Sequence, residues 1–152
     1  MCFIFAFSQA GKINSNPLKA KGYIEQSPLP AGANTTLVFD LSLDEPHRAY
    51  SDQFKVQSKK PDLIRLGEIS FTNEIEFDDV HSKKKKRGIE KYGELRVPIE
   101  VSINYPRGET ELPIQLTYQA CTDEYCLLPK TIDVPVKVKV VNTYGENNVP
   151  SL

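Results

Sequence analysis

The sequence lacks the features that mark several common classes of protein. No stretch reaches the roughly 18 consecutive apolar residues of a membrane span, so we expect no segment that crosses a membrane. There is no excess of positive charge, because 19 Lys and Arg stand against 20 Asp and Glu. A nucleic-acid partner, which usually requires a broad positive field, is therefore not expected. A glycine-rich phosphate loop, an internal repeat and a Ser/His/Asp arrangement are also missing, so hydrolase chemistry has no support.

Long apolar runs at helical spacing are missing too, whereas turn-forming residues are common. Eleven Pro and eight Gly among 152 residues argue against a helical bundle and favour short strands joined by turns. A chain of this length suits one globular domain and buries roughly 68–70% of its unfolded surface. Neither a metal nor a disulfide is needed to stabilise it, so its three cysteines need their own explanation.

Apolar and polar residues alternate along several segments, which is the pattern of half-buried strands. The row that begins at Gly93 is the longest, with apolar residues at alternate positions as far as Tyr105. The predicted strands lie at 36–43, 53–57, 64–70, 93–105, 112–120 and 132–140. About six to eight strands at such spacing predict an antiparallel, all-β sandwich.

The first ten residues, MCFIFAFSQA, form a short apolar run that ends in small residues suited to signal-peptidase cleavage. We expect export, with Cys2 removed along with this segment; a misassigned start codon and an ordinary buried strand are the alternatives. The predicted organisation is a signal-peptide remnant at 1–10, a flexible or edge segment at 11–25, the β-domain at 26–145 and a tail at 146–152. Cys121 and Cys126 then remain.

Opposite charges lie side by side in the middle of the chain. The basic run at 83–87 follows an acidic stretch that contains Glu74, Glu76, Asp78 and Asp79. Composition favours a solvated loop between strands. Nuclear localisation or binding to a polyanion is the alternative.

Four residues separate Cys121 from Cys126, at a point where one strongly patterned strand ends and another soon begins. This spacing predicts a hairpin loop, in which opposed cysteines lie close enough for a disulfide. Closing so small a loop removes little entropy from the unfolded chain, so chemical reactivity is a sharper explanation than stability. Cys121 follows the inward-facing Ala120, which predicts that it lies outside the main core and within reach of a redox partner.

The two histidines, His47 and His81, could join the cysteines as metal ligands. Zinc sites of this kind usually show paired Cys-x2-Cys or His-x3-His spacing, which this sequence lacks. We therefore predict neither a metal nor a cofactor.

The strand register adds a constraint on the hairpin. If Cys121 opposes Cys126 in an unbroken ladder, Leu116 faces Thr131, which sets an inward residue against an outward one. One unpaired residue near 127–129 restores the pairing of Leu116 with Ile132. We predict a bulge there, with Pro129 as its location because proline cannot donate to the ladder.

The motif Tyr118-Gln119-Ala120-Cys121, then Cys126, then Leu128-Pro129-Lys130-Thr131, resembles the amino-terminal periplasmic domain of the thiol:disulfide interchange protein DsbD. The likeness covers 26–141 and includes Leu29-Pro30-Ala31-Gly32, the stretch 47–54 and Phe77-Asp78-Asp79. It implies an immunoglobulin-like fold. It also implies a cysteine pair that accepts electrons from the family's own thioredoxin-like domain and passes them to oxidised periplasmic thioredoxin-fold proteins.

The resemblance also implies roles for individual residues. Cys121 and Cys126 are the redox pair, and Cys126 is the attacker of the partner's disulfide. Tyr50 packs beside them, while Asp78 and Asp79 match acidic residues and are candidates to take up a thiol proton. In the family an aromatic cap covers the cysteines; here Val80 or His81 occupies its place, with Phe77 just before, and the choice among them stays open.

Two hypotheses follow from the sequence. The first is a monomeric periplasmic dithiol carrier, an oxidoreductase-type electron-transfer domain that exchanges with thioredoxin-fold proteins. Because the chain ends at Leu152 without a membrane core or a thioredoxin-like domain, its electrons are expected from a separate membrane donor. The second is a structural or adhesive extracytoplasmic sandwich with a non-catalytic hairpin disulfide, whose basic run contacts an acidic surface.

Overall fold

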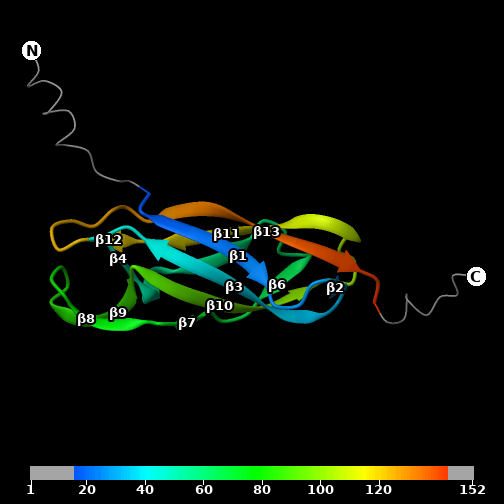
Figure 1. Cartoon of the computed structure of the whole chain (residues 1–152), viewed down its shortest axis with the longest axis horizontal. Coiled ribbons are helices and arrows are strands. Elements are labelled where there is room, and N and C mark those ends of the chain that lie inside the picture. Colours follow the sequence, from blue (N-terminus) through cyan, green and yellow to red (C-terminus); the bar gives the residue numbers. More distant parts are fainter. Residues whose placement is uncertain (1–15, 144–152) are drawn as a thin grey trace, which may run out of the picture.

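Two β-sheets face each other in the computed structural model, which describes residues 16–143 (Figure 1). One sheet has nine strands and the other has four. The predicted signal segment at 1–10 and the tail at 146–152 lie outside the described residues. Within 16–143, no helix is long and apolar enough to cross a membrane.

The larger sheet carries most of the segments that matter below. Its main path runs through β1 (Leu18–Ile24), β3 (Asn34–Leu43), β10 (Tyr92–Val101), β9 (Lys84–Glu90), β4 (Arg48–Tyr50) and β12 (Ala120–Cys121). Three further strands join this path: β6 (Ile64–Leu66) and β7 (Ser70–Thr72) pair with β10, and β8 (Ile75–Asp79) pairs with β9. A short 3-10 turn, η1 (Ser51–Gln53), follows β4.

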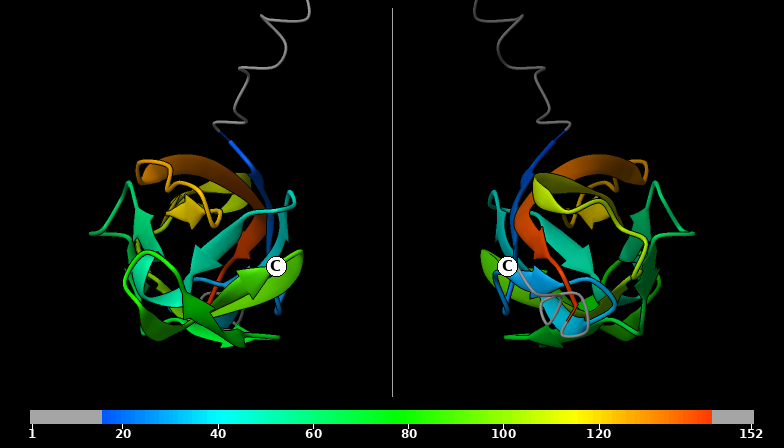
Figure 2. Two further views of the ribbon diagram at one scale, coloured as in Figure 1. Left: turned by 90° about the vertical axis from the view of Figure 1, so that its left-hand side faces the viewer. Right: turned by 90° about the vertical axis from the view of Figure 1, so that its right-hand side faces the viewer.

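The smaller sheet has the order β2 (Leu29–Pro30), β13 (Lys130–Val141), β11 (Gly108–Tyr118) and β5 (Lys55–Ser58). Its pairs are antiparallel except for β2 and β13, which run parallel. The end-on views in Figure 2 show how the two sheets enclose an interior.

Apolar side chains from both sheets fill this interior, as the alternation predicts. The larger sheet contributes the buried rows of β3 and β10, and the smaller sheet those of β11 and β13. Representative members are Leu37, Phe39, Leu95, Val97, Leu112, Ile114, Val134 and Val136. The prediction of a sandwich is confirmed. The segment 64–70, predicted as one strand, instead divides into β6 and β7 at Gly67, whose N–H donates to the Pro98 carbonyl at 2.8 Å.

Most of the basic run belongs to a strand, which corrects the prediction of a solvated loop at 83–87. Most of it lies on β9, paired with the acidic strand β8, so that Asp78 faces Lys85 and Phe77 faces Lys86. The Asp78 carboxylate lies 3.2 Å from the Lys85 ammonium group. Composition was misleading because opposite charges that are close in sequence become favourable cross-strand neighbours in a hairpin.

The register of the cysteine hairpin agrees with the sequence prediction. Leu116 pairs with Ile132 in the β11–β13 ladder, whereas Cys121 forms an isolated bridge with Cys126. The N–H of Leu127 donates to the Ala120 carbonyl at 2.9 Å. Leu128 and Pro129 therefore span the interval that Gln119 spans on the other strand, and the predicted extra residue is confirmed.

A close approach at Gly88 generates a first prediction. Gly88 pairs with Tyr50, and a Cβ atom there would lie 2.3 Å from the backbone oxygen of Ala49. We expect Gly88→Ala to separate β9 from β4 and to lower the free energy of unfolding by about 1–3 kcal/mol in urea denaturation. Gly67→Ala is the control, because its Cβ would meet only the Pro98 ring, at 3.2 Å, and a smaller loss is expected. Equal losses would contradict the steric argument.

Candidate functional site

A disulfide joins Cys121, on β12, to Cys126 in the following loop, with a Cα–Cα distance of 4.0 Å. Strand β12 is held at the end of the larger sheet by its pairing with β4, in which Cys121 faces Arg48. Across the hairpin, the Gln119 side-chain amide donates to the Leu127 carbonyl at 3.2 Å. The disulfide is therefore attached to regular structure on the Cys121 side.

The four residues between the cysteines form a loop that is closed by its own hydrogen bonds. Thr122 donates its N–H to the Tyr125 carbonyl at 2.7 Å. Its hydroxyl oxygen accepts from the N–H groups of Glu124 and Tyr125 at 3.1 and 3.2 Å. A threonine hydroxyl that satisfies nearby backbone donors stabilises a tight turn. This loop consequently holds Cys126 in position through backbone contacts rather than through the disulfide alone.

The two cysteine residues differ in exposure, which corrects one expectation. Cys121 lies outside the main apolar cluster, as its parity predicts, but it is only 2% exposed. Cys126 is exposed. Parity places Cys121 on the outer face of its strand but says nothing of what covers that face. A redox partner would therefore reach Cys126 first.

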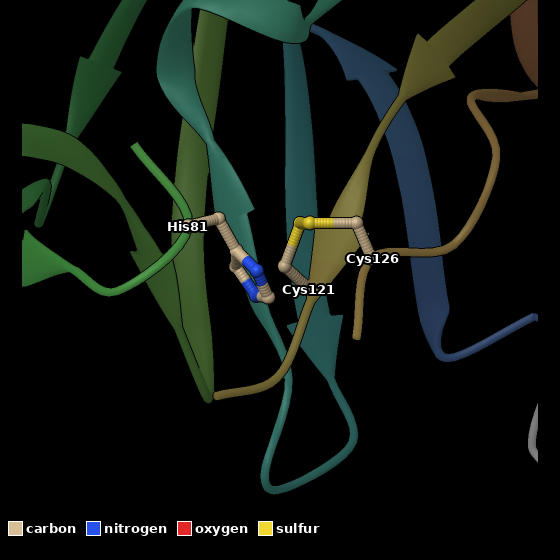
Figure 3. Close-up of side chains that lie close together, drawn as sticks. All are labelled: His81, Cys121 and Cys126. Carbon is tan, nitrogen blue, oxygen red and sulfur yellow. A yellow bond between two sulfur atoms is a disulfide. The ribbon is translucent and has the colours of Figure 1, made fainter. Parts of the chain in front are cut away.

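His81 lies against the disulfide from the hairpin tip, which we define as residues 80–83 between β8 and β9 (Figure 3). A ligand-capable atom of each of His81, Cys121 and Cys126 lies within 4.8 Å of the others. The ring is oriented by Nε2, which lies 2.6 Å from the Thr122 carbonyl oxygen. Because a carbonyl only accepts, Nε2 carries the proton and donates it there. His47, by contrast, is buried elsewhere, with Nε2 3.3 Å from the Tyr125 hydroxyl.

The other two cap candidates have different surroundings. Val80 is 51% exposed. The Phe77 ring packs instead near Tyr50, with ring centroids 5.8 Å apart, and beneath the Arg48 guanidinium, 4.8 Å from the ring centre. Of the three residues, the structure brings His81 to the cysteine pair.

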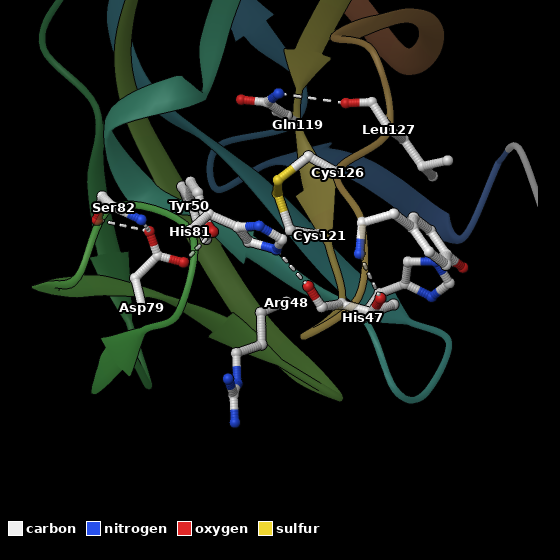
Figure 4. The surroundings of a disulfide bond; sticks show 12 residues. His47, Arg48, Tyr50, Asp79, His81, Ser82, Gln119, Cys121, Cys126 and Leu127 are labelled. Carbon is white, nitrogen blue, oxygen red and sulfur yellow. Dashed lines mark hydrogen bonds between the residues drawn. A yellow bond between two sulfur atoms is a disulfide. The ribbon is translucent and has the colours of Figure 1, made fainter.

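Asp79 anchors the hairpin tip. Its carboxylate is 5% exposed and accepts hydrogen bonds from the Tyr50 hydroxyl and from the Ser82 N–H and hydroxyl, the last two at 3.0 and 2.6 Å (Figure 4). Burial raises the pKa of Asp79, but the hydrogen bonds from Ser82 and Tyr50 outweigh it and lower the pKa to about 2. Burial and the contact with Asp79 together raise the pKa of Tyr50. Asp79 is thus ionised at neutral pH and is a poor proton acceptor.

Asp78 is turned away from this anchor. Its side chain is 87% exposed and makes the ion pair with Lys85. The structure therefore does not bring Asp78 to the disulfide, although the two aspartates are neighbours in sequence.

Arg48 is a site residue that the sequence reasoning missed. Its guanidinium lies 3.0 Å from Glu90 and 3.4 Å from Asp123, in addition to its place over Phe77. It therefore pairs with a carboxylate of the loop between the two cysteines. A depression of about 660 Å³ beside this loop is lined in part by His47, Arg48 and Tyr125. The sequence does contain a signal for Arg48, because this residue stands two positions before Tyr50 in the stretch 47–54 that carries the family resemblance.

The anchor generates a second prediction. Replacing Asp79 by Asn removes the charge that Tyr50 and Ser82 solvate, and we expect the free energy of unfolding to fall by about 1–3 kcal/mol at pH 7. The pKa is lowered from 3.8 to about 2, so the stabilisation by the ionised group is present above pH 3.8 and is lost as the pH falls toward 2. In urea denaturation, the difference in the free energy of unfolding between the wild type and Asp79→Asn should become smaller as the pH falls over that range.

Asp78→Asn is the matched control for this experiment, because it removes only an exposed ion pair worth about 0–1 kcal/mol. A loss for Asp78→Asn as large as that for Asp79→Asn would show that Asp79 is not the anchor.

Comparisons with known proteins are consistent with this arrangement. Residues 15–137 match the family described as "Thiol:disulfide interchange protein DsbD, N-terminal". No curated protein matches the chain significantly. The structure is similar to the reduced N-terminal domain of DsbD from Neisseria meningitidis, with a TM-score of 0.61, 14% identity and coverage of 87% of this chain and 94% of that one. This likeness confirms the expected immunoglobulin-like β-sandwich.

A second similar structure is the N-terminal periplasmic domain of ScsB from Proteus mirabilis. Its TM-score is 0.47 at 12% identity, with 80% of this chain and 45% of that one covered. The family match is the stronger finding because it spans more than half of the sequence. This chain belongs to the family of N-terminal domains of thiol:disulfide interchange protein DsbD.

Proposed function

We propose that this domain carries electrons in the periplasm by thiol–disulfide exchange with thioredoxin-fold proteins, through Cys121 and Cys126. The observation that carries the proposal is the asymmetry of the cysteine pair, with Cys126 exposed on a hydrogen-bonded loop and Cys121 buried at a sheet edge. The family match supports thiol–disulfide interchange. The apolar segment at 1–10 and the resemblance to a periplasmic domain support the location.

The reduced domain gives two electrons to its partner in two steps. The Cys126 thiolate attacks one sulfur of the partner's disulfide, forming a mixed disulfide, and the partner's other sulfur leaves as a thiolate and takes up a proton. Cys121 then loses its proton and attacks the Cys126 sulfur, which releases the partner as a dithiol and forms the intramolecular disulfide. Two electrons and two protons leave the domain. A dithiol donor reduces the disulfide of the domain again by the same steps in reverse order.

The geometry supports these separate roles. An attacking sulfur must approach the partner's disulfide directly, which suits the exposed Cys126 and excludes the 2%-exposed Cys121. A resolving sulfur needs only to reach Cys126, and it lies on the opposed strand with its Cα 4.0 Å away. His81 lies beside the pair, so a partner that docks on Cys126 also meets the hairpin tip.

A trapping experiment tests the roles of the two cysteines. With an oxidised thioredoxin-fold partner, Cys121→Ala should accumulate a mixed disulfide through Cys126, because no sulfur remains to resolve it. Cys126→Ala should trap little, because its remaining thiol is buried. Non-reducing electrophoresis measures the adduct, and the variant lacking both cysteines is the control. Equal trapping by both variants would contradict the assignment.

The reduction potential separates an electron carrier from a structural module. Structural disulfides usually lie below about −300 mV, and exchange-active ones lie above it. We expect this disulfide to lie above that value when it is equilibrated with a thiol–disulfide buffer and its redox state is read by thiol alkylation. A potential well below it would instead favour a sandwich whose disulfide only stiffens the hairpin.

A further inference from the structure

We propose that the reduced cysteine pair and His81 form a zinc site that exists only while the disulfide is open. Three donor atoms from two separate segments converge here, a Cys-thiolate pair from the β12 hairpin and an imidazole from the β8–β9 tip. The inference goes beyond electron transfer and rests on the proposed function only in that the disulfide must be reducible.

The spacing of the donors suits a tetrahedral ion. Ligand atoms of His81, Cys121 and Cys126 all lie within 4.8 Å of one another. Zinc with two thiolates and one imidazole sets its ligand atoms about 3.5–3.8 Å apart, from bond lengths of about 2.3 and 2.0 Å. Breaking the sulfur–sulfur bond frees both cysteine side chains to rotate to that separation, and His81 is on an exposed tip that can follow them.

The hydrogen bond of His81 is the one that a metal-binding histidine usually makes. Its Nε2–H donates to the Thr122 carbonyl, which leaves the Nδ1 lone pair free in the neutral ring. Histidines that bind metals almost always donate their second ring nitrogen to a carbonyl or carboxylate, which fixes the tautomer and the ring orientation. In Figure 4 the ring of His81 lies beside the disulfide, and a dashed line marks the hydrogen bond that one of its nitrogens makes.

Charge favours occupancy of the reduced site. Two thiolates held on opposed strands repel each other, and a bound cation relieves that repulsion. The neighbouring carboxylates are already engaged, because Asp123 pairs with Arg48 and Asp79 accepts hydrogen bonds from Tyr50 and Ser82. A divalent zinc ion bound by two thiolates leaves the site neutral, and the exposure of His81 and Cys126 leaves room for a water molecule as fourth ligand.

Oxidation expels the metal from this site. A disulfide oxidant accepts two electrons from the two thiolates and two protons from water, becoming a dithiol, while Cys121 and Cys126 form their bond and zinc leaves. Bound zinc therefore protects the reduced pair, and an oxidised pair has no thiolate to hold zinc.

Zinc titration of the intact chain tests the site, with a chromophoric chelator as competitor. The reduced protein should bind one equivalent of Zn²⁺, the oxidised protein none, and a disulfide reagent added to the complex should release the metal. His81→Gln keeps an amide N–H for Thr122 but removes the ring lone pair, so its affinity should fall by more than about tenfold. Val80→Ala, on the same tip, is the control and should bind as the wild type does.

Zinc affinity unchanged in both His81→Gln and His81→Ala would overturn the site, as would equal binding by the oxidised protein. Thermal unfolding of each variant verifies that the fold is intact. Exchange with an oxidised thioredoxin-fold protein, measured in chelator, separates this inference from the proposed function. If the domain exchanges disulfides but its zinc binding does not depend on His81, only the zinc site is contradicted. If it binds zinc but does not exchange disulfides, only the electron-carrier role is contradicted.

Discussion

The buried hydrogen bond from Tyr50 to Asp79 is the interaction on which the site depends. Tyr50 belongs to β4, which pairs on one side with the cysteine strand β12 and on the other with β9. Asp79 ends β8 and holds the hairpin tip through Ser82. This contact connects β4, the neighbour of the strand that carries Cys121, to the hairpin tip, and it helps to position His81, two residues after Asp79.

The sequence is a good guide wherever a residue's neighbours are set by its own strand. Alternation predicts the buried faces of β3, β10, β11 and β13, because each strand has one side against the other sheet. Parity between Leu116 and Ile132 predicts the extra residue near Pro129 for the same reason. Both arguments use only the two-residue repeat of a strand and the requirement that apolar side chains are buried between the sheets.

The same arguments do not reach contacts between distant segments. His81 and Thr122 are 41 positions apart, and no spacing rule indicates that they meet. The burial of Cys121 was missed because parity gives the face of a strand but not what packs against that face, and the strand β9 was missed because a basic run has no apolar alternation. The partners of the acidic residues near the site also come from other strands, since Arg48, Lys85 and Tyr50 each engage one of the carboxylates.

In the proposed electron transfer, the exposure of Cys126 alone determines the order in which the donor and the acceptor bind. Since Cys126 is the exposed member of the pair, a donor and an acceptor must occupy the same place on the domain. They cannot bind together, so no ternary complex forms and each cycle alternates between two binary encounters. Such a carrier follows ping-pong kinetics. The domain alternates between its oxidised and reduced forms and transfers electrons between a donor and an acceptor that do not contact each other.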